Sequence, residues 1–188
     1  VQSETAWIRA MIPVNMRTAH EMKSLSACNV VSAIFLDRTP TQIRDPESLL
    51  QGIRAEMDLI RENKLALMFI FSIWVRKILS WGRHAPKDVR RCETSFVFSN
   101  LGKVFSKSPL RSSSSSSREL VAGSITLTDF EILAPLNPFM IAAFTFVQFG
   151  ERGRITLRYD DRILHQQQAS ILMQHVQRNL ERHAEDHE

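Results

Sequence analysis

Two apolar segments of this chain end in polar residues whose types can stabilise a developing negative charge. The first spans 12–17 and reads Ile-Pro-Val-Asn-Met-Arg, and the second spans 94–102 and reads Thr-Ser-Phe-Val-Phe-Ser-Asn-Leu-Gly. A hydroxyl or amide group at a strand end can donate a hydrogen bond to the oxyanion of a tetrahedral intermediate. Ser99 and Asn100 are therefore candidate catalytic residues. They would lie near the oxyanion or near the group that accepts the transferred part of the substrate. Because Asn-x-Gly also favours a turn, a purely structural role for both residues stays open.

Asn15 and Arg17, at the end of the first segment, have a structural alternative as well. Charged groups often belong to ion-pair networks that only hold the fold together. In that role Arg17 would pair with Asp160 or Asp161. Asn15 would hydrogen-bond exposed backbone at the strand end. The residues alone favour these structural roles.

The composition predicts one globular domain. The 188 residues are 44% hydrophobic, which is enough for a core of ordinary size. The net charge is +4, and the basic residues are scattered rather than clustered, so nucleic-acid binding is not expected. Cys28 and Cys92 lie far apart, which argues against a disulfide scaffold or a zinc site and favours a reducing, cytoplasmic compartment. The histidines form no ligand set, so no metal is expected.

The first half of the chain reads as two strands followed by two helices. Residues 6–16 and 30–36 are apolar runs bounded by polar segments, as strands are. Asp45 is a predicted N-cap for a helix over 46–63. The most apolar stretch of the chain, 65–75, is too short for a bilayer span of about 20 residues. We interpret it as a buried helix that continues to about Trp81. Lining an acyl-chain channel or touching a membrane surface are the alternatives.

The second half reads as a strand, a long loop, further strands and a terminal helix. Residues 103–119 contain six consecutive serines and predict a mobile loop. The other predicted elements are a strand at 93–99, a strand at 124–133, a hairpin of 139–149 with 154–159 whose turn is 150–153, and a helix at 165–183. This order predicts a single α/β domain over 1–188, with a mixed β-sheet covered by helices.

Four short motifs resemble one enzyme superfamily. They are the Pro-Val-Asn-Met-Arg strand at 13–17, Asn29 at the start of the next strand, Ser-Asn-Leu-Gly at 99–102, and the last strand and helix beginning at Thr156. In this order they resemble the C-terminal half of the CoA-dependent acyltransferase superfamily. That superfamily includes condensation domains, wax ester synthases, alcohol acetyltransferases and chloramphenicol acetyltransferase. Cys28 stands where the family has a glycine before its asparagine.

The resemblance implies half of an enzyme. In the family, two lobes face each other across a tunnel, and a histidine of a His-His-x-x-x-Asp-Gly motif in the first lobe is the general base. No His-His pair occurs in this sequence. The start at Val1 looks like a cut through a longer protein, so an N-terminal catalytic lobe is expected on the same or another chain. We expect the parent protein to be an acyltransferase and this fragment alone to be inactive.

The resemblance also implies substrates and partners. The acyl donor would be a thioester of coenzyme A or of a carrier-bound phosphopantetheine, and the acceptor an alcohol or amine, with no bound cofactor. Asn15, Arg17 and Asn29 would then bind substrate. A homodimer through the exposed lobe face and membrane association of the cytoplasmic protein are further expectations.

One histidine imitates the missing motif, and one other function stays open. His84 and Asp88 have the His-x-x-x-Asp spacing, but Val89 follows in place of glycine. Pro86 and the flanking basic residues favour a solvated connector there. The alternative function is a noncatalytic interaction module on the same scaffold, which binds a carrier or partner protein.

Overall fold

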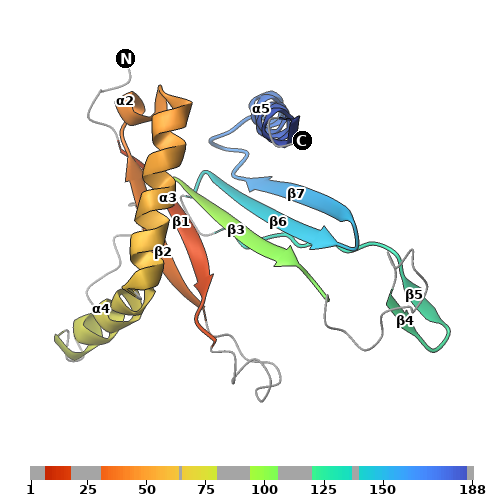
Figure 1. Cartoon of the computed structure of the whole chain (residues 1–188), viewed down its shortest axis with the longest axis horizontal. Helices are drawn as coiled ribbons and strands as arrows, with labels where there is room; N and C mark the ends of the chain where they lie inside the picture. Colours follow the sequence, from red (N-terminus) through yellow and green to blue (C-terminus); the bar gives the residue numbers. More distant parts are fainter. Residues whose placement is uncertain are drawn as a thin grey trace. The chain divides into compact units, whose positions relative to one another are not determined.

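The computed structural model describes residues 7–17, 31–63, 65–79, 94–105, 120–136 and 140–185 (Figure 1). They form an α/β protein with a mixed five-stranded sheet flanked by helices. Its elements, in chain order, are β1 (Ile8–Asn15), β2 (Val31–Arg38), α2 (Pro40–Ile43), α3 (Pro46–Glu62), α4 (Ala66–Leu79), β3 (Phe96–Lys103), β4 (Leu120–Ala122), β5 (Ile125–Leu127), β6 (Ala142–Phe149), β7 (Arg152–Tyr159) and α5 (Gln166–Glu185). The predicted fold class, α/β with a mixed sheet, is confirmed at this level.

The larger sheet has the strand order β2-β1-β3-β6-β7, and β4 and β5 form a separate pair. β1 pairs with β2 antiparallel and with β3 parallel, while β6 and β7 are antiparallel. By its internal contacts the chain divides into two compact units, residues 1–98 and 99–188. The boundary falls within β3, and each unit is described by itself.

Unit 1 is built on the antiparallel pair of β1 and β2. The eight paired positions run from Ile8–Arg38 to Asn15–Val31. Burial along β2 follows the two-residue period of a strand with one covered face, since Ser32, Ile34 and Leu36 are buried. The predicted helix at 46–63 is confirmed as α3, and its N-cap is Asp45, whose carboxylate accepts from the Glu47 amide at 3.2 Å.

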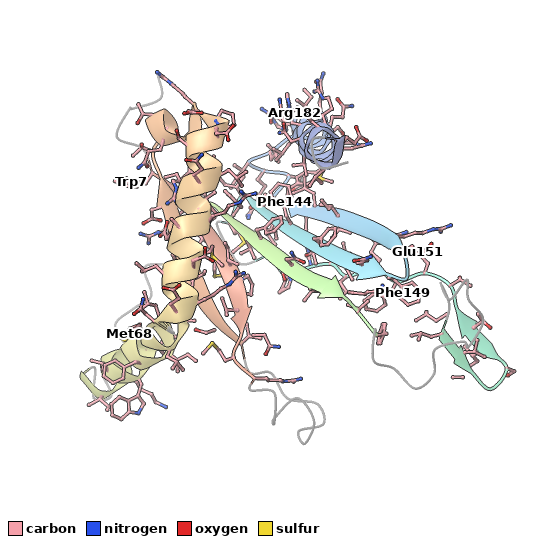
Figure 2. The ribbon with its side chains drawn as sticks, in the orientation of Figure 1. Trp7, Met68, Phe144, Phe149, Glu151 and Arg182 are labelled. Carbon is pink, nitrogen blue, oxygen red and sulfur yellow. The ribbon has the colours of Figure 1, made fainter. Side chains whose placement is uncertain are left out.

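Helix α4 corrects the prediction of a buried helix at 65–81. The helix exists, but Ala66 is its one buried residue among the side chains that are described. It meets β2 through one face, where the Phe69 and Phe35 rings lie 5.4 Å apart and Ser32 donates to the Ala66 carbonyl at 2.6 Å. Seven of its large apolar side chains, among them the labelled Met68, are about half exposed (Figure 2). Within the described ranges, none of the helices has the length and apolar character needed to cross a membrane.

Unit 2 has its core at β6. This strand is buried on both faces, and Met140, Thr145 and Val147 are the largest fully buried side chains among the described residues. The predicted hairpin is confirmed, with a shorter turn than expected. β7 begins at Arg152, which pairs with Phe149, so Gly150 and Glu151 alone form the turn. Gly150 has φ +60°, a value that glycine adopts without strain.

The predicted strand at 124–133 is wrong beyond Leu127. β5 ends there, and 128–136 are described without regular structure. Side chains of β7 hold this segment instead: Arg154 donates to Asp129 at 2.6 Å, and Thr156 donates to the Ile132 carbonyl at 2.8 Å. The bond from Thr156 occupies a backbone carbonyl that strand pairing would otherwise use. Of the predicted serine-rich loop, 106–119 lie outside the described residues.

Candidate functional site

Ser99 and Asn100 lie in β3, which extends the predicted strand to Lys103. Ser99 is half-buried and Asn100 is exposed. The Asn100 Oδ1 atom accepts a hydrogen bond from the Gly102 amide at 2.9 Å, and Gly102 has φ +58°. The turn geometry expected of Asn-x-Gly is therefore present inside the strand. Within the described ranges, the Ser99 hydroxyl and the Asn100 NH₂ group have no hydrogen-bond partner.

Asn15 repeats this geometry at the end of β1. It is the last residue of the strand, is exposed, and accepts through Oδ1 from the Arg17 amide at 3.0 Å. The expected bond from Asn15 to exposed backbone is thus confirmed. Each asparagine accepts through its carbonyl oxygen from the amide two residues later, which leaves its NH₂ group as the remaining donor.

Of the two carboxylates expected to pair with Arg17, Asp160 makes an ion pair with Arg162. The Asp160 carboxylate accepts two hydrogen bonds from the Arg162 guanidinium, at 2.6 and 2.8 Å. These bonds lower the pKa of the Asp160 carboxyl below its usual value. Arg17 itself is half-buried beside the end of β1. A partner two residues away on the chain costs little closure entropy, which favours Arg162 over a remote arginine.

Several predicted residues lie outside the part of the chain that the structure describes. They are Asn29, His84, Cys28 and Cys92. Of the candidates that are described, Asn15 and Arg17 belong to unit 1, and Ser99 and Asn100 belong to unit 2. Within each unit, Asn15 is bonded to the Arg17 amide and Asn100 to the Gly102 amide.

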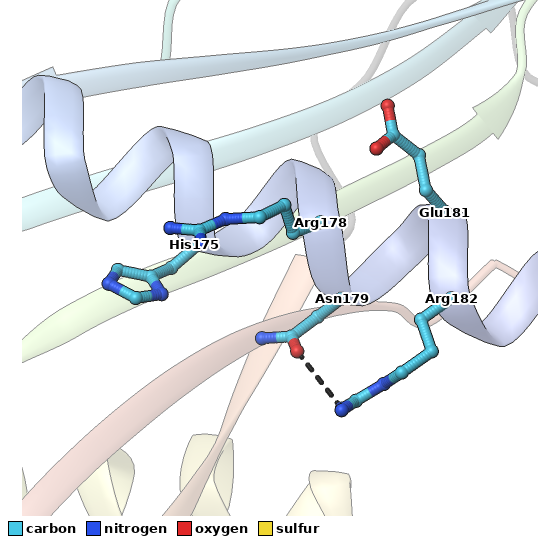
Figure 3. Close-up of a pocket in the computed structure, with 5 residues that line it drawn as sticks. All are labelled: His175, Arg178, Asn179, Glu181 and Arg182. Carbon is cyan, nitrogen blue, oxygen red and sulfur yellow. Dashed lines mark hydrogen bonds between the residues drawn. The ribbon is translucent and has the colours of Figure 1, made fainter.

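A polar hollow on α5 was not predicted. Its volume is about 430 Å³, and it is lined by His175, Arg178, Asn179, Glu181 and Arg182 (Figure 3). Arg182 donates to Asn179 at 3.1 Å, and Arg178 to the Gln174 carbonyl at 3.3 Å. The i, i+3, i+4 and i+7 spacing was the available sequence signal. All five residues come from one helix, so the hollow is a solvated helix face. No group of His, Cys, Asp and Glu in the described ranges could hold a metal ion.

Comparison with known proteins gives no relative for this arrangement. No model of a known protein family matches the chain, and neither a curated protein nor a solved structure does so. The fold and the local geometry of the two asparagines are therefore the basis for assigning a function.

Proposed function

We propose that this chain is the C-terminal lobe of an acyltransferase related to the CoA-dependent superfamily. It would help to move an acyl group from a thioester of coenzyme A or of a carrier-bound phosphopantetheine to an alcohol or amine. The observation that carries this proposal is the repeated asparagine geometry on β1 and β3. These strands pair in parallel at Ala10–Phe96 and Met11–Val97. Asn15 belongs to unit 1 and Asn100 to unit 2, so the geometry of each asparagine is a separate local observation.

The chemistry follows from the donors that these polar residues of β1 and β3 present. Acyl transfer passes through a tetrahedral intermediate whose oxygen carries negative charge, and preorganised N–H or O–H donors stabilise it. The Asn100 NH₂ group is oriented by the bond from the Gly102 amide to its carbonyl oxygen. Neighbouring residues of a strand point to opposite faces, so the Ser99 hydroxyl is a donor on the other face of β3 from Asn100. In such an enzyme Asn15 and Arg17 would contact substrate from β1.

The general base would come from another lobe. A base must reach the acceptor hydroxyl within hydrogen-bond distance. The histidines with described side chains, His165 and His175, lie just before and on α5, and His175 faces the polar hollow. The proposed lobe division assigns the base to an N-terminal lobe with the His-His-x-x-x-Asp-Gly motif. This chain would then provide oxyanion donors and part of the tunnel.

The decisive test combines the chain with the N-terminal lobe that the proposal requires. Release of free thiol from an acyl-CoA in the presence of an alcohol is the assay. We expect no turnover from this chain alone and turnover from the two lobes together. Ser99→Ala should then lower kcat by about 100-fold, while Ser170→Ala, an exposed serine of α5, should leave it unchanged.

Two outcomes would overturn the enzyme proposal in different ways. Turnover by this chain alone that His84→Ala abolishes would place the base here instead of in a second lobe. A parent protein whose preceding lobe lacks the His-His-x-x-x-Asp-Gly motif would favour the noncatalytic interaction module. In that case carrier-protein binding, measured by calorimetry, should persist without any thiol release.

A further inference from the structure

We infer that α4 inserts into the surface of a lipid bilayer with anionic headgroups. Seven large apolar side chains of this helix are between 44% and 58% exposed. They are Leu67, Met68, Ile70, Phe71, Ile73, Trp74 and Ile78. An apolar surface of this density on a short helix marks an interaction site. The inference is independent of the acyl-transfer proposal, because no residue of α4 belongs to the candidate site.

The exposed apolar surface of α4 is wide, which favours contact with lipid over packing in a groove of one protein. At about 100° per residue, Leu67, Phe71, Trp74 and Ile78 fall on one line along the helix. Met68 lies on one side of this line, and Ile70 and Ile73 lie on the other, so the arc of these side chains covers about 220°. Lys77 falls within the same arc at the C-terminal end of the helix, after the apolar run has ended. A helix that packs on one protein surface needs a stripe of only about 100°. An arc of twice that width suits immersion in hydrocarbon.

The polarity of α4 also suits hydrocarbon. The run from Leu65 to Val75 has no charged residue. Its one hydroxyl, on Ser72, donates to the Phe69 carbonyl at 2.7 Å and is satisfied within the helix. Hydrocarbon tolerates only groups that are satisfied internally. The Trp74 ring, stacked on Phe71 at 6.0 Å, has the apolar body and single N–H group that favour the headgroup boundary.

Charge complementarity identifies the lipid headgroups. Arg76 and Lys77 directly follow the apolar run, and the whole chain carries a net charge of +4. Basic side chains beside a buried apolar face are attracted to anionic lipids within a Debye length of the surface. The helix has 14 residues, and at 1.5 Å per residue it is about 21 Å long. A hydrocarbon core of about 30 Å is thicker, so α4 would lie in the interface.

Vesicle binding by the full chain tests this inference. The probes are phosphatidylcholine vesicles and matched vesicles that also contain phosphatidylserine, and the measurement is cosedimentation. We expect binding to the anionic vesicles that weakens as salt is added. Phe71→Ser with Ile78→Ser should lower it at least tenfold. The matched control Leu180→Ser, which removes an equally exposed leucine of α5, should leave it unchanged. Lys77→Glu should weaken binding to the anionic vesicles only.

A second measurement needs no change in α4. With Trp7 and Trp81 replaced by Phe, Trp74 is the one remaining tryptophan. Its fluorescence should shift to shorter wavelength with anionic vesicles and be quenched by brominated acyl chains. Failure of quenching would overturn the inference. A second result would also overturn it: the chain does not bind vesicles but forms dimers in sedimentation, and Phe71→Ser dissociates these dimers. A second copy of the chain would then cover α4.

Discussion

Helix α4 and strand β6 show that apolar content does not decide burial. Both are apolar, yet α4 leaves seven large side chains about half exposed, whereas β6 buries residues on both of its faces. β6 lies between β3 and β7 in the sheet, and the aromatic ring of Phe130 packs near that of Phe149 at its end. α4 meets β2, an edge strand, through one side. The number of neighbouring elements therefore decides burial.

The largest effect should come from truncating one phenylalanine in each element. Phe144 of β6 is 8% exposed and Phe71 of α4 is 54% exposed. Phe144→Ala should lower the free energy of unfolding by about 3 to 5 kcal/mol, because it removes buried area and leaves a cavity. Phe71→Ala should change it by no more than about 0.5 kcal/mol. Urea unfolding followed by circular dichroism measures both. Equal losses of unfolding free energy would show that the two phenylalanines do not differ in burial.

The sequence predicted elements well where the pattern alone determines them. Asp45 at the start of α3 and Gly150 in the hairpin turn have local causes, a cap and a positive φ, and both were found where expected. The exposure of α4 was missed because the same apolar run fits a core helix or an interaction surface. The end of β5 at Leu127 was missed because Arg154, distant in the chain, holds Asp129.

The candidate site was predictable as a pattern rather than as an arrangement. Asn15 and Asn100 were identified from their positions before Arg17 and Gly102, and both make the bond to the second amide that such turns favour. The actual partner of Asp160 is Arg162. Sequence alone could not choose between that neighbour and Arg17, because charge type says nothing about distance.

Two paired threonines, one in β6 and one in β7, test how buried hydroxyl groups affect the stability of unit 2. Thr145 pairs with Thr156, and both are buried. The Thr156 hydroxyl donates to the Ile132 carbonyl, but the Thr145 hydroxyl has no partner among the described residues. Thr145→Val should therefore stabilise the fold by about 1 kcal/mol. Thr156→Val should destabilise it by about 1 to 3 kcal/mol, since it leaves the carbonyl unpaired. If both variants lowered the free energy of unfolding in urea, this distinction would be contradicted.

One glycine in each unit should respond oppositely to the same change. Gly52 lies inside α3 and Gly102 has φ +58° in β3, and an added Cβ atom would meet nothing within 4 Å at either site. Gly52→Ala should stabilise the fold by about 0.5 to 1 kcal/mol, because alanine favours helix. Gly102→Ala should cost about 1 kcal/mol, because a left-handed backbone strains a residue with Cβ. Thermal unfolding measures both, and a stabilising Gly102→Ala would mean that the φ of this residue is not fixed.

The smallest effect concerns an exposed ion pair, which stabilises unit 1 without burial. Arg9 donates two hydrogen bonds of 2.6 Å to Asp37, and these bonds hold the pKa of the Asp37 carboxyl below its usual value. Because the folded state favours the ionised carboxylate, its stabilisation is present above the unfolded pKa of about 3.9 and is lost as the pH falls through the lower, folded pKa. Asp37→Asn should therefore be less stable than the native chain near about pH 7, and the difference should narrow near about pH 3. Arg9→Lys keeps the positive charge but loses the two paired donors. This variant should therefore lose only part of the stabilisation that the ion pair gives near about pH 7. Melting temperatures at the two pH values measure the effect, and a difference of constant size would show that Asp37 contributes through packing instead of charge.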